Sequence, residues 1–400
     1  MNNETRKETQ VLPKDVRYVG ADDLTLPLFE NQYPVQPMGV SYNSYLILDE
    51  KIAVMDSVDA RAADEWLAKL AHELNGRSPD YLVISHMEPD HSGSILRLAE
   101  KYQEMKLVGN TKTFTMLRQF FGAKAPTDDR LLEVGEGETL PLGAHTLHFM
   151  LAPMVHWPEV MVAYEETEKL LFSADAFGRF GSLGRTANAP WAPQARRYYY
   201  NIVGKYGAQV QALLKKAAAL EIETICPLHG PVLTGEALGE ALRLYDLWSR
   251  WQSESPDDIL LAHASIHGNT ARAAELFKQK LEAKGARVTL CDLTTTEVSY
   301  AVANAFYCGK LVLACSTYDG GLFPPMEEFL SHLQAKGFRD RSVGLMENGS
   351  WAPAAARLMR AKLEEMKDLR VCGTVVSLRS ALSPASEAQI DALTTELCAK

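Results

Sequence analysis

The chain has 400 residues, of which 46% are hydrophobic and 23% are charged. This composition is typical of a globular protein, and the length exceeds that of one ordinary hydrophobic core, so we expect two domains. The formal net charge of -10 argues against a nucleic-acid partner.

The six cysteines are scattered and form no CxxC pair, which argues against a zinc knuckle or a rubredoxin-type iron centre. Their scatter predicts reduced, mostly buried thiols. Residues 1–14 are polar and lack the apolar run of a signal peptide, and no apolar run approaches the length of a membrane span. We therefore expect a cytoplasmic protein without a membrane partner.

Short apolar runs with strand character alternate with helical patterns in residues 1–252. The expected strands are Ser44–Leu48, Ile52–Met55, Tyr81–Ile84, Leu147–Leu151 and Lys169–Phe172, and the expected helices are Ala62–Leu74, Ile95–Lys101 and Val210–Leu220. Long strand-rich stretches between helices predict a layered α/β domain in which sheets pack face to face under helices.

The segment Ser253–Asp258 is polar and contains a proline, which predicts a boundary between a domain of residues 1–252 and a domain of residues 257–400. Strands and helices then alternate strictly. The expected strands are Ile259–Ala264, Val288–Asp292, Leu311–Cys315, Ser342–Met346 and Val371–Leu378, and the expected helices are Thr270–Lys284, Val298–Ala305, Met326–Lys336, Ala354–Lys367 and Ser386–Lys400. This alternation predicts a doubly wound parallel sheet of flavodoxin size, whose ligand binds at the carboxyl ends of the strands.

Four potential metal ligands follow the expected strand that ends at Ile84. They are His86, Glu88, Asp90 and His91. Pro89 and Gly93 predict that this segment is a loop and not the interior of a helix. A loop at a strand end can direct several side chains toward one point, and histidine and carboxylate are common ligands of transition metals.

Three further candidates each follow a run with strand character, namely His156, Asp175 and His229. A single His or Asp before a turn is more often a capping residue or a satisfied structural residue. Seven candidates together exceed the needs of one tetrahedral zinc, and they suit two metals that share a carboxylate.

The run from His86 to His91 resembles the HxHxDH motif of the metallo-β-lactamase superfamily, with Glu88 in place of the second histidine. The HxExDH variant, followed by a later His, Asp and His, is similar to the flavodiiron proteins, in which a lactamase-like fold holds iron. An anionic carboxylate in place of an imidazole shifts a site toward iron and helps to stabilise its oxidised state.

The resemblance implies which residues bind each iron. One iron takes His86, Glu88 and His156, the other takes Asp90, His91 and His229, and Asp175 bridges the two. Some family members do not use the histidine that matches His91 as a ligand. Open coordination positions remain, as a catalytic site requires, and no catalytic residue beyond the ligands is implied.

The first strand of the second domain leads into a loop of Ser265, Ile266, His267, Gly268, Asn269 and Thr270. This loop resembles the T/S-x-T-G-x-T loop of flavodoxins, whose hydroxyls and N–H groups surround the FMN phosphate at the positive end of a helix. Ser265 and Thr270 keep the outer hydroxyls, and His267 replaces the middle threonine as a hydrogen-bond donor to the phosphate. Gly268 lets the backbone approach closely.

Two more glycine-bearing loops follow the third and fourth strands of this domain. They contribute Ser316, Thr317, Tyr318, Asp319, Gly320 and Gly321, and then Asn348, Gly349, Ser350 and Trp351. Tyr318 and Trp351 are candidates to stack on the flavin ring. Three loops at the carboxyl ends of successive inner strands predict an FMN site.

The resemblance covers essentially the whole chain, including the order of its domains. It implies an αββα sandwich of the metallo-β-lactamase type followed by a flavodoxin-like sheet, in an oxidoreductase that reduces O₂ to water or NO to N₂O. It also implies a head-to-tail homodimer or a homotetramer. No CxxC module or flavin-reductase domain follows the second domain, so the implied electron donor is a separate protein, rubredoxin or a similar one.

Two alternatives remain open. A zinc-dependent lactamase-like hydrolase with an accessory flavodoxin module is disfavoured by Glu88, and a non-catalytic electron carrier is disfavoured by the complete ligand set. The sequence does not decide between O₂ and NO. The run Tyr198–Tyr200 is either a source of selectivity between these gases or an ordinary aromatic edge.

Overall fold

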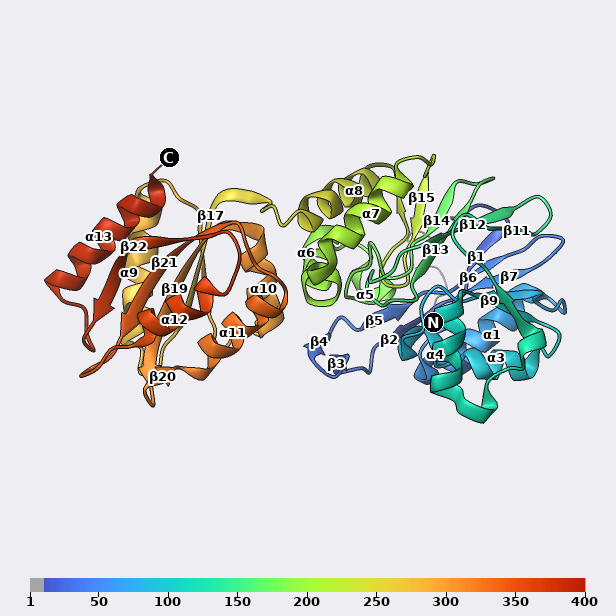
Figure 1. The fold of residues 1–400 in the computed structure, drawn as a ribbon, viewed down its shortest axis with the longest axis horizontal. Coiled ribbons are helices and arrows are strands. Elements are labelled where there is room, and N and C mark those ends of the chain that lie inside the picture. The colour runs from blue at the N-terminus through green and yellow to red at the C-terminus, as the bar shows by residue number, and fades with distance from the viewer. Residues whose placement is uncertain (1–10, 400) are drawn as a thin grey trace. The chain divides into compact units, whose positions relative to one another are not determined.

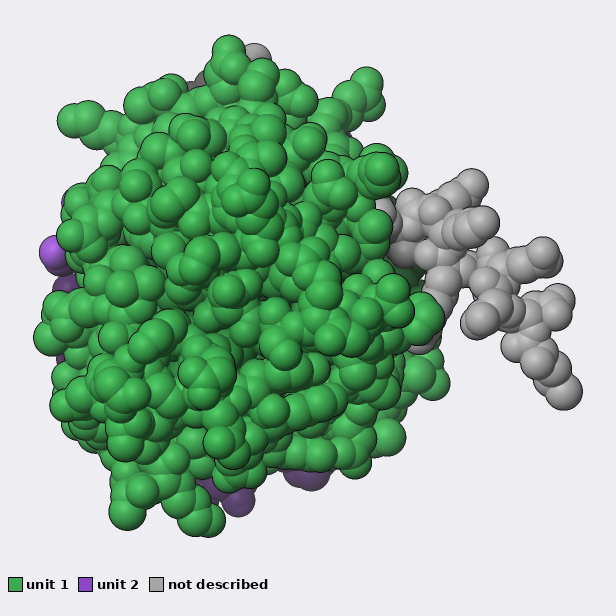
Figure 2. All heavy atoms as spheres, turned by 90° about the vertical axis from the view of Figure 1, so that its right-hand side faces the viewer, with its two compact units in different colours: residues 1–246 green, residues 247–400 purple. Residues whose placement is uncertain are grey.

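The computed structural model describes residues 11–399, and the chain divides into two compact units, residues 1–246 and residues 247–400 (Figure 1). Figure 2 shows one face of the first unit. The predicted domain limits at residues 252 and 257 stay predictions, and residues 1–10 of the N-terminal polar segment lie outside the described part. Within residues 11–399, none of the helices combines the length and the apolar character that crossing a membrane requires.

Two six-stranded mixed sheets form the centre of the first unit. The first sheet has the order β1-β6-β7-β8-β9-β10, with strands Val16–Tyr18, Tyr45–Ile47, Ala53–Met55, Tyr81–Val83, Lys106–Gly109 and Leu131–Glu133. The second has the order β11-β12-β13-β14-β15-β16, with strands Thr139–Pro141, Thr146–Leu151, Met161–Glu165, Leu170–Phe172, Thr224–Cys226 and Leu233–Thr234. Two small antiparallel pairs join β2 (Ala21–Asp23) to β5 (Val40–Tyr42) and β3 (Leu28–Phe29) to β4 (Tyr33–Pro34).

Helices cover the outer faces of the two sheets (Figure 1). Those near the first sheet are α1 (Ala63–Leu74), α3 (Ile95–Lys101) and α4 (Thr111–Phe121), and those near the second are α7 (Gly207–Ala217) and α8 (Gly235–Ser249). The shorter helices are α2 (Pro89–Ser92), α5 (Leu183–Thr186) and α6 (Trp191–Tyr198). The predicted αββα sandwich is therefore confirmed.

Side chains from alternate strand positions fill the space between the two sheets. Tyr45 and Ile47 of β6 meet Leu147 and Phe149 of β12 in one buried cluster. The intervening Leu46 is also fully buried, and because side chains alternate along a strand it faces the helical layer. Burial on both faces explains why these strands read as continuous apolar runs, and each large side chain contributes about 1.5–3 kcal/mol.

The second unit is a five-stranded parallel sheet of order β18-β17-β19-β21-β22. Its strands are β17 (Ser255–Ala264), β18 (Val288–Asp292), β19 (Cys308–Tyr318), β21 (Arg341–Asn348) and β22 (Leu369–Leu378). Its helices are α9 (Asn269–Ala283), α10 (Val298–Tyr307), α11 (Pro324–Ala335), α12 (Ala355–Glu364) and α13 (Pro384–Cys398). Figure 1 shows α9 and α13 on one side of the sheet and α10 and α11 on the other. The predicted doubly wound sheet is confirmed.

Two details of this unit differ from the predictions. Strand β17 begins at Ser255, inside the segment predicted as a linker, because Ser255 pairs with Cys308 before the register shifts at Ile259. A short strand β20 (Gly321–Leu322) folds back on the end of β19, within a segment that was predicted as a loop. The cysteine prediction holds: all six are free, and all but the partly buried Cys398 are buried.

Candidate di-metal centre and flavin pocket

The seven predicted metal ligands come from four places in the first unit and meet at one end of the sandwich. His86 and Glu88 follow β8, and His156 lies between β12 and β13. Asp175 follows β14, and His229 follows β15. Because β14 and β15 are parallel neighbours, their carboxyl ends place Asp175 and His229 at the same edge.

The segment after Glu88 is a one-turn helix, α2, and not the loop that was predicted. Pro89 occupies the first helical position, where its missing N–H has no intrahelical partner to lose. The N–H groups of His91 and Ser92 donate to the carbonyl oxygen of Glu88 at 2.9 and 2.8 Å. This turn fixes Asp90 and His91 relative to Glu88.

The first group of ligand atoms consists of His86, Glu88, His156 and one oxygen of Asp175. Nε2 of His156 lies 3.1 Å from Oε2 of Glu88 and 3.0 Å from Oδ2 of Asp175. Nε2 of His86 lies 3.3 and 3.4 Å from the same two oxygens. The two histidines therefore direct their Nε2 atoms at the same pair of carboxylate oxygens.

The second group consists of Asp90, His91 and His229. Nε2 of His91 and Nε2 of His229 lie 3.3 and 3.2 Å from Oδ2 of Asp90. They also lie 3.2 and 3.5 Å from Oδ1 of Asp175. Asp175 thus turns one carboxylate oxygen to each group, which is the placement of a bridging ligand.

The polar atoms of this site lack partners in a way that fits metal binding. Both oxygens of Asp90 and Oδ1 of Asp175 are buried and have no hydrogen-bond partner among the described residues. The Nε2 atoms of His91 and His229 lie only 3.1 Å apart, although two neutral ring nitrogens gain nothing from contact unless one donates. With metal–ligand bonds of about 2.1 Å, neighbouring ligand atoms lie roughly 3.0–3.4 Å apart, close to the spacings found here.

Outer contacts, meaning hydrogen bonds between a metal ligand and a residue outside the ligand set, orient two of the histidines. Nδ1 of His86 lies 2.7 Å from Oε1 of Glu159, which also accepts from the N–H of Met87 at 2.9 Å. Nδ1 of His229 lies 2.7 Å from the carbonyl oxygen of Ser41. Both rings are therefore fixed with Nε2 free for a metal. His91 differs, because its Nδ1 has no hydrogen-bond partner among residues 11–399.

Glu159 was not predicted from the sequence, and replacing it tests its role as a positioning residue. We expect Glu159→Ala to lower metal affinity by roughly 10- to 100-fold, because His86 then loses the acceptor that fixes its ring. Titration of the metal-free variant with Co²⁺, monitored by the absorption of the bound ion, measures this metal affinity. Rescue by Glu159→Gln, whose carbonyl oxygen still accepts, is the control. Unchanged Co²⁺ affinity in Glu159→Ala would contradict the assignment.

The site changes the pKa values of its own ligands. Burial lowers the pKa of His156, but hydrogen bonds to Asp175 and Glu88 outweigh it and raise this pKa to about 9. Burial likewise opposes a charge on His86, and the contacts with Glu159 and Glu88 raise its pKa well above the ordinary value. Without a metal, these histidines hold protons that an incoming cation must displace.

Metal uptake by the metal-free protein is therefore expected to strengthen as the pH rises. The folded-state pKa of His156, about 9, lies above the ordinary value of 6.5. The proton on His156 therefore stabilises the folded, metal-free protein fully below pH 6.5, and this stabilisation is lost as the pH rises through 9. Each displaced histidine proton should raise the apparent affinity about tenfold per pH unit in this window. Co²⁺ titrations at three pH values measure it, and a flat profile would contradict the prediction.

An aromatic wall borders the second group of ligands. The ring of His229 lies 5.3 Å from Phe29 and 5.5 Å from Tyr198, and Phe180 packs against both of these aromatic rings. The hydroxyl of Tyr198 is buried and has no hydrogen-bond partner among the described residues. Burial, and then the charges of nearby Asp175 and other carboxylates, raise the pKa of Tyr198, so its hydroxyl keeps its proton.

The three tyrosines of the run Tyr198–Tyr200 lie in different surroundings, and a role in selectivity between the two gases stays a prediction. Tyr198 ends α6 beside the ligands, whereas Tyr199 and Tyr200 begin a π-helical turn (Tyr199–Val203). Tyr199 packs against Tyr200 and Tyr245 at ring distances of 5.1 and 5.0 Å. Tyr198 is the member of the run that lies at the metal site.

In the second unit, a cavity of about 530 Å³ lies at the carboxyl ends of the strands. It is lined by Ser265, Ile266, His267, Asn269, Thr270, Ser316, Thr317, Tyr318, Asp319, Gly320, Asn348, Gly349, Ser350, Trp351, Ala352 and Ser380. Gly268 and Gly321, both predicted contacts, do not line it: Gly268 is the N-cap of α9 with φ +85°, and Gly321 pairs in β20. Ala352 and Ser380 line it without having been predicted.

A hydrogen-bonded network joins the loops around this cavity. Oγ1 of Thr270 and Oγ of Ser316 lie 2.9 Å apart, and Nδ2 of Asn348 donates to Oγ1 of Thr270 at 3.2 Å. Oδ1 of Asn348 accepts from the N–H of Ser380 at 3.0 Å. The N–H groups of Ala354 and its neighbour donate to Oγ1 of Thr317. The cavity is therefore preformed, and its size and aromatic rim suit a flavin.

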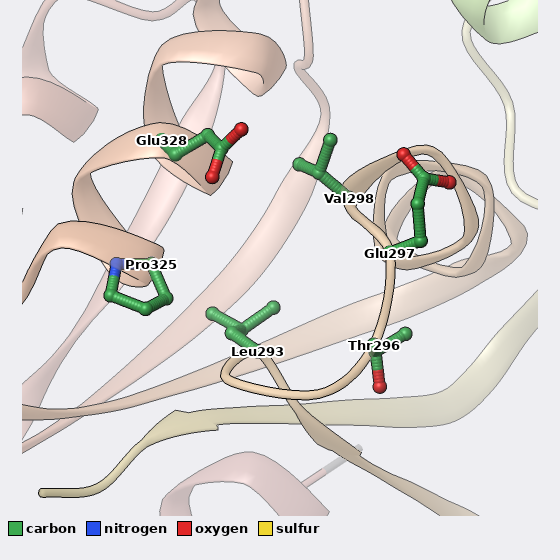
Figure 3. Close-up of a pocket in the computed structure, with 6 residues that line it drawn as sticks. All are labelled: Leu293, Thr296, Glu297, Val298, Pro325 and Glu328. Atoms are coloured by element: carbon green, nitrogen blue, oxygen red, sulfur yellow. The ribbon is translucent and has the colours of Figure 1, made fainter. Parts of the chain in front are cut away.

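A smaller cavity of about 220 Å³ lies between the loop after β18 and the start of α11 (Figure 3). Leu293, Thr296, Glu297, Val298, Pro325 and Glu328 line it. Glu297 already accepts from the N–H of Ser299 at 3.1 Å as the cap of α10. This cavity includes none of the predicted site residues.

Comparisons with known proteins show what this chain is similar to. A family model described as "ODP family beta lactamase" matches residues 40–230. An anaerobic nitric oxide reductase flavorubredoxin of Vibrio vulnificus is 26% identical over 88% of this chain and 72% of its own length. A flavo-diiron protein of Clostridium acetobutylicum is 26% identical over 82% of this chain and 84% of its own length.

Among solved structures, the rubredoxin oxygen:oxidoreductase of Desulfovibrio gigas superposes with a TM-score of 0.89 at 25% identity, covering 98% of both chains. The fold and the site together define a lactamase-like di-metal protein that carries a flavodoxin-like unit. The predicted resemblance is confirmed: this chain is related to the flavodiiron proteins over both of its units.

Proposed function

We propose that this chain is an oxidoreductase that binds two non-haem irons at the seven-ligand site and FMN in the larger cavity, and that reduces O₂ to water or NO to N₂O. The observation that carries the proposal is the placement of Asp175, with one oxygen toward each ligand group. Glu88 in the first group favours iron over zinc. Relatives named for oxygen and nitric oxide reduction support the same reaction class.

When bound, the irons and the flavin supply the electron-transfer chemistry, and the protein supplies position and protons. Asp175, held between His156 and His91, keeps the two metal sites at a fixed separation. Phe29 packs against His229, and Phe180 packs against Phe29 and Tyr198, so apolar rings border this side of the site. Tyr198, whose ring packs against His229, keeps the proton on its buried hydroxyl and is the proposed proton donor at this site.

Replacing Tyr198 by phenylalanine tests this proton donor. We expect metal and flavin contents to remain unchanged and gas consumption to fall by roughly 10²-fold, since a positioned proton donor contributes 10²- to 10⁴-fold. Tyr199→Phe, which alters a neighbouring hydroxyl away from the ligands, is the matched control. Equal rates for Tyr198→Phe and Tyr199→Phe would exclude a proton-donating role for Tyr198.

A second copy of the chain is the proposed partner, as a head-to-tail homodimer or a homotetramer. Exposed apolar side chains support it in both units: Leu24 and Met38 flank the segment that carries Phe29, and Ile266, Tyr318 and Trp351 surround the flavin cavity. Trp351 is 87% exposed, and exposed apolar groups of this kind commonly mark an interface. Rubredoxin or a similar small protein is the proposed electron donor, and the cytoplasm is the proposed location.

The choice of gas is tested by reducing the loaded protein without oxygen and then adding O₂ or NO in separate electrode experiments. The proposal requires consumption of at least one gas, coupled to reoxidation of the flavin. If neither gas is consumed by a chain that holds two irons and FMN, the proposed reaction is wrong. Hydrolysis of a lactam or ester by a zinc-loaded chain would instead favour the hydrolase alternative.

A further inference from the structure

Arg179 is buried in the interior of the first unit, with 2% of its surface exposed. Its guanidinium donates four hydrogen bonds, all to the segment that leads into α6. Nη2 donates to the carbonyl oxygen and to Oγ1 of Thr186, both at 2.7 Å. Nη1 donates to the carbonyl oxygens of Ala189 and Pro190 at 3.0 and 3.2 Å. Arg179 therefore joins three residues of this segment to its own part of the chain.

The interior position of this guanidinium is costly. Burial lowers the pKa of Arg179 to about 10, and no charge in the described part of the chain offsets this effect. Its Nε atom is buried as well and has no hydrogen-bond partner among residues 11–399. Because a buried charge needs hydrogen bonds in place of water, the four acceptors before α6 are what hold it there. Only a planar guanidinium presents its donors as a fork that reaches them together.

Arg179 and its neighbour Phe177 together fix the start of α6. Pro190 is the N-cap residue of this helix, and its carbonyl oxygen accepts from Arg179. Nε1 of Trp191, the first helical residue, donates to the carbonyl oxygen of Phe177 at 3.2 Å. Phe177 and Arg179 belong to the stretch of chain that follows Asp175. The start of α6 is therefore tied to a stretch that begins at a proposed metal ligand.

Tyr198 lies at the other end of α6, beside the second group of ligands. Its ring lies 5.5 Å from the ring of His229 and 5.2 Å from the ring of Phe180. A β-carbon on Gly178 would lie 3.2 Å from Cε1 of Tyr198 and 3.5 Å from Cβ of His229, so the glycine makes room for this close approach. Because α6 is a rigid element of only eight residues, a displacement of its start also moves Tyr198.

We propose that Arg179 is a positioning residue, which sets the place of Tyr198 beside the metal ligands by fixing the start of α6. The stem of Arg179 also packs against Gly230, next to His229, so a direct effect on metal binding is the competing explanation. The inference rests on the proposed function only where gas consumption is concerned. The place of Tyr198 relative to a bound metal can be measured without any reaction.

This place is measured in the full chain produced with fluorotyrosine and loaded with Co²⁺, using fluorine NMR. The Tyr198 signal is the one missing from Tyr198→Phe, and bound Co²⁺ broadens the signals of the nearest rings most. In Arg179→Gln the broadening of the Tyr198 signal should fall, because a helix released at its start moves away from the packed ligands. Co²⁺ affinity should stay within about twofold, well short of the roughly 10-fold loss expected when a ligand loses its outer partner.

The matched control is Arg130→Gln. Arg130 also donates four hydrogen bonds to carbonyl oxygens in the first unit, those of Ala99, Tyr102 and Met105. These acceptors lie neither in α6 nor in a ligand segment, so the Tyr198 signal should not change in this control.

Two further variants separate charge from geometry. Arg179→Lys keeps the charge and lacks the fork, so it should resemble Arg179→Gln. Thr186→Val removes only the Oγ1 acceptor, and it should reduce the broadening of the Tyr198 signal by a smaller amount. It serves as the test if neither Arg179 variant folds.

Gas consumption gives a second test through a double-mutant cycle. Arg179→Gln should slow consumption by roughly 10-fold, since a misplacement of ~1 Å can cost about 10²-fold. In a Tyr198→Phe background the same substitution should change the rate less than about twofold, because the hydroxyl through which it acts is absent.

Five results would overturn the inference: an unchanged Tyr198 signal in Arg179→Gln, an equal change in Arg130→Gln, a full recovery in Arg179→Lys, Co²⁺ affinity lowered about tenfold or more, or additive effects in the cycle. If the loaded, unmodified chain consumed neither gas, the proposed function would fail, and the NMR result would still decide the role of Arg179.

Discussion

Replacing Asp175 by alanine is expected to remove both metals and to lower gas consumption by at least ~10³-fold, while FMN stays bound. Outer partners of metal ligands already contribute about 10- to 100-fold, and Asp175 contacts both ligand groups directly. Its oxygens lie 3.0 Å from Nε2 of His156 and 3.2 Å from Nε2 of His91. Metal analysis, flavin absorbance and an oxygen or NO electrode measure the three quantities.

The matched control is Asp49→Ala. Oδ2 of Asp49 lies 2.7 Å from Nδ1 of His145, and both side chains are buried in the first unit. This variant also breaks a carboxylate–histidine pair, but the pair is not among the seven ligands. It should keep two metals and full gas consumption. If Asp175→Ala behaved like Asp49→Ala, the bridging role of Asp175 would be disproved.

Replacing Glu88 has the second-largest expected effect, because it alters one ligand group and leaves the other. Glu88→Ala should reduce the iron content from two to about one per chain, since Asp90, His91 and His229 remain. Gas consumption should fall by about 10³-fold, because one ligand and its negative charge are lost. Iron content and electrode rates measure the result.

Glu88→His separates the oxidoreductase from the hydrolase alternative. Histidine restores the HxHxDH pattern and a third ligand, so two metals should bind again. Its neutral ring removes the charge that favours iron, and the balance between iron and zinc should move toward zinc. Full O₂ or NO consumption by an iron-loaded Glu88→His chain would show that the carboxylate has no special role in redox chemistry.

Most of the candidate site follows from local sequence patterns. Glu88, between His86 and Asp90, marks the lactamase-like loop, and each later ligand follows an apolar strand. The structure brings all seven together because those strand ends meet at one end of the sandwich. The alternation of strands and helices after residue 258 likewise predicted the doubly wound sheet of the second unit.

The outer contacts could not be predicted, because they join segments that are distant in sequence. Glu159 reaches His86 across 73 residues, and the Ser41 carbonyl reaches His229 across 188. No spacing rule connects such pairs before the sheets have packed. The small strand pairs, such as β3 with β4, have two residues each, too few to give a periodic signal.

The fine limits of elements also depend on tertiary packing. Pro89 and Gly93 indicated a loop, but the chain between them closes into the helical turn α2. Gly268 takes the positive φ of the cap of α9, and its contact with the flavin stays a prediction.

The central claim is that this chain couples a flavin to two irons for the reduction of a diatomic gas. The most direct test is to purify the chain without added zinc, determine iron, zinc and FMN per chain, reduce it without oxygen, and follow flavin absorbance after adding O₂ or NO. Two irons and one FMN per chain, with flavin reoxidation that keeps pace with gas consumption, are predicted. Two zincs and no iron per chain, or flavin reoxidation that is unchanged in Asp175→Ala, would contradict it.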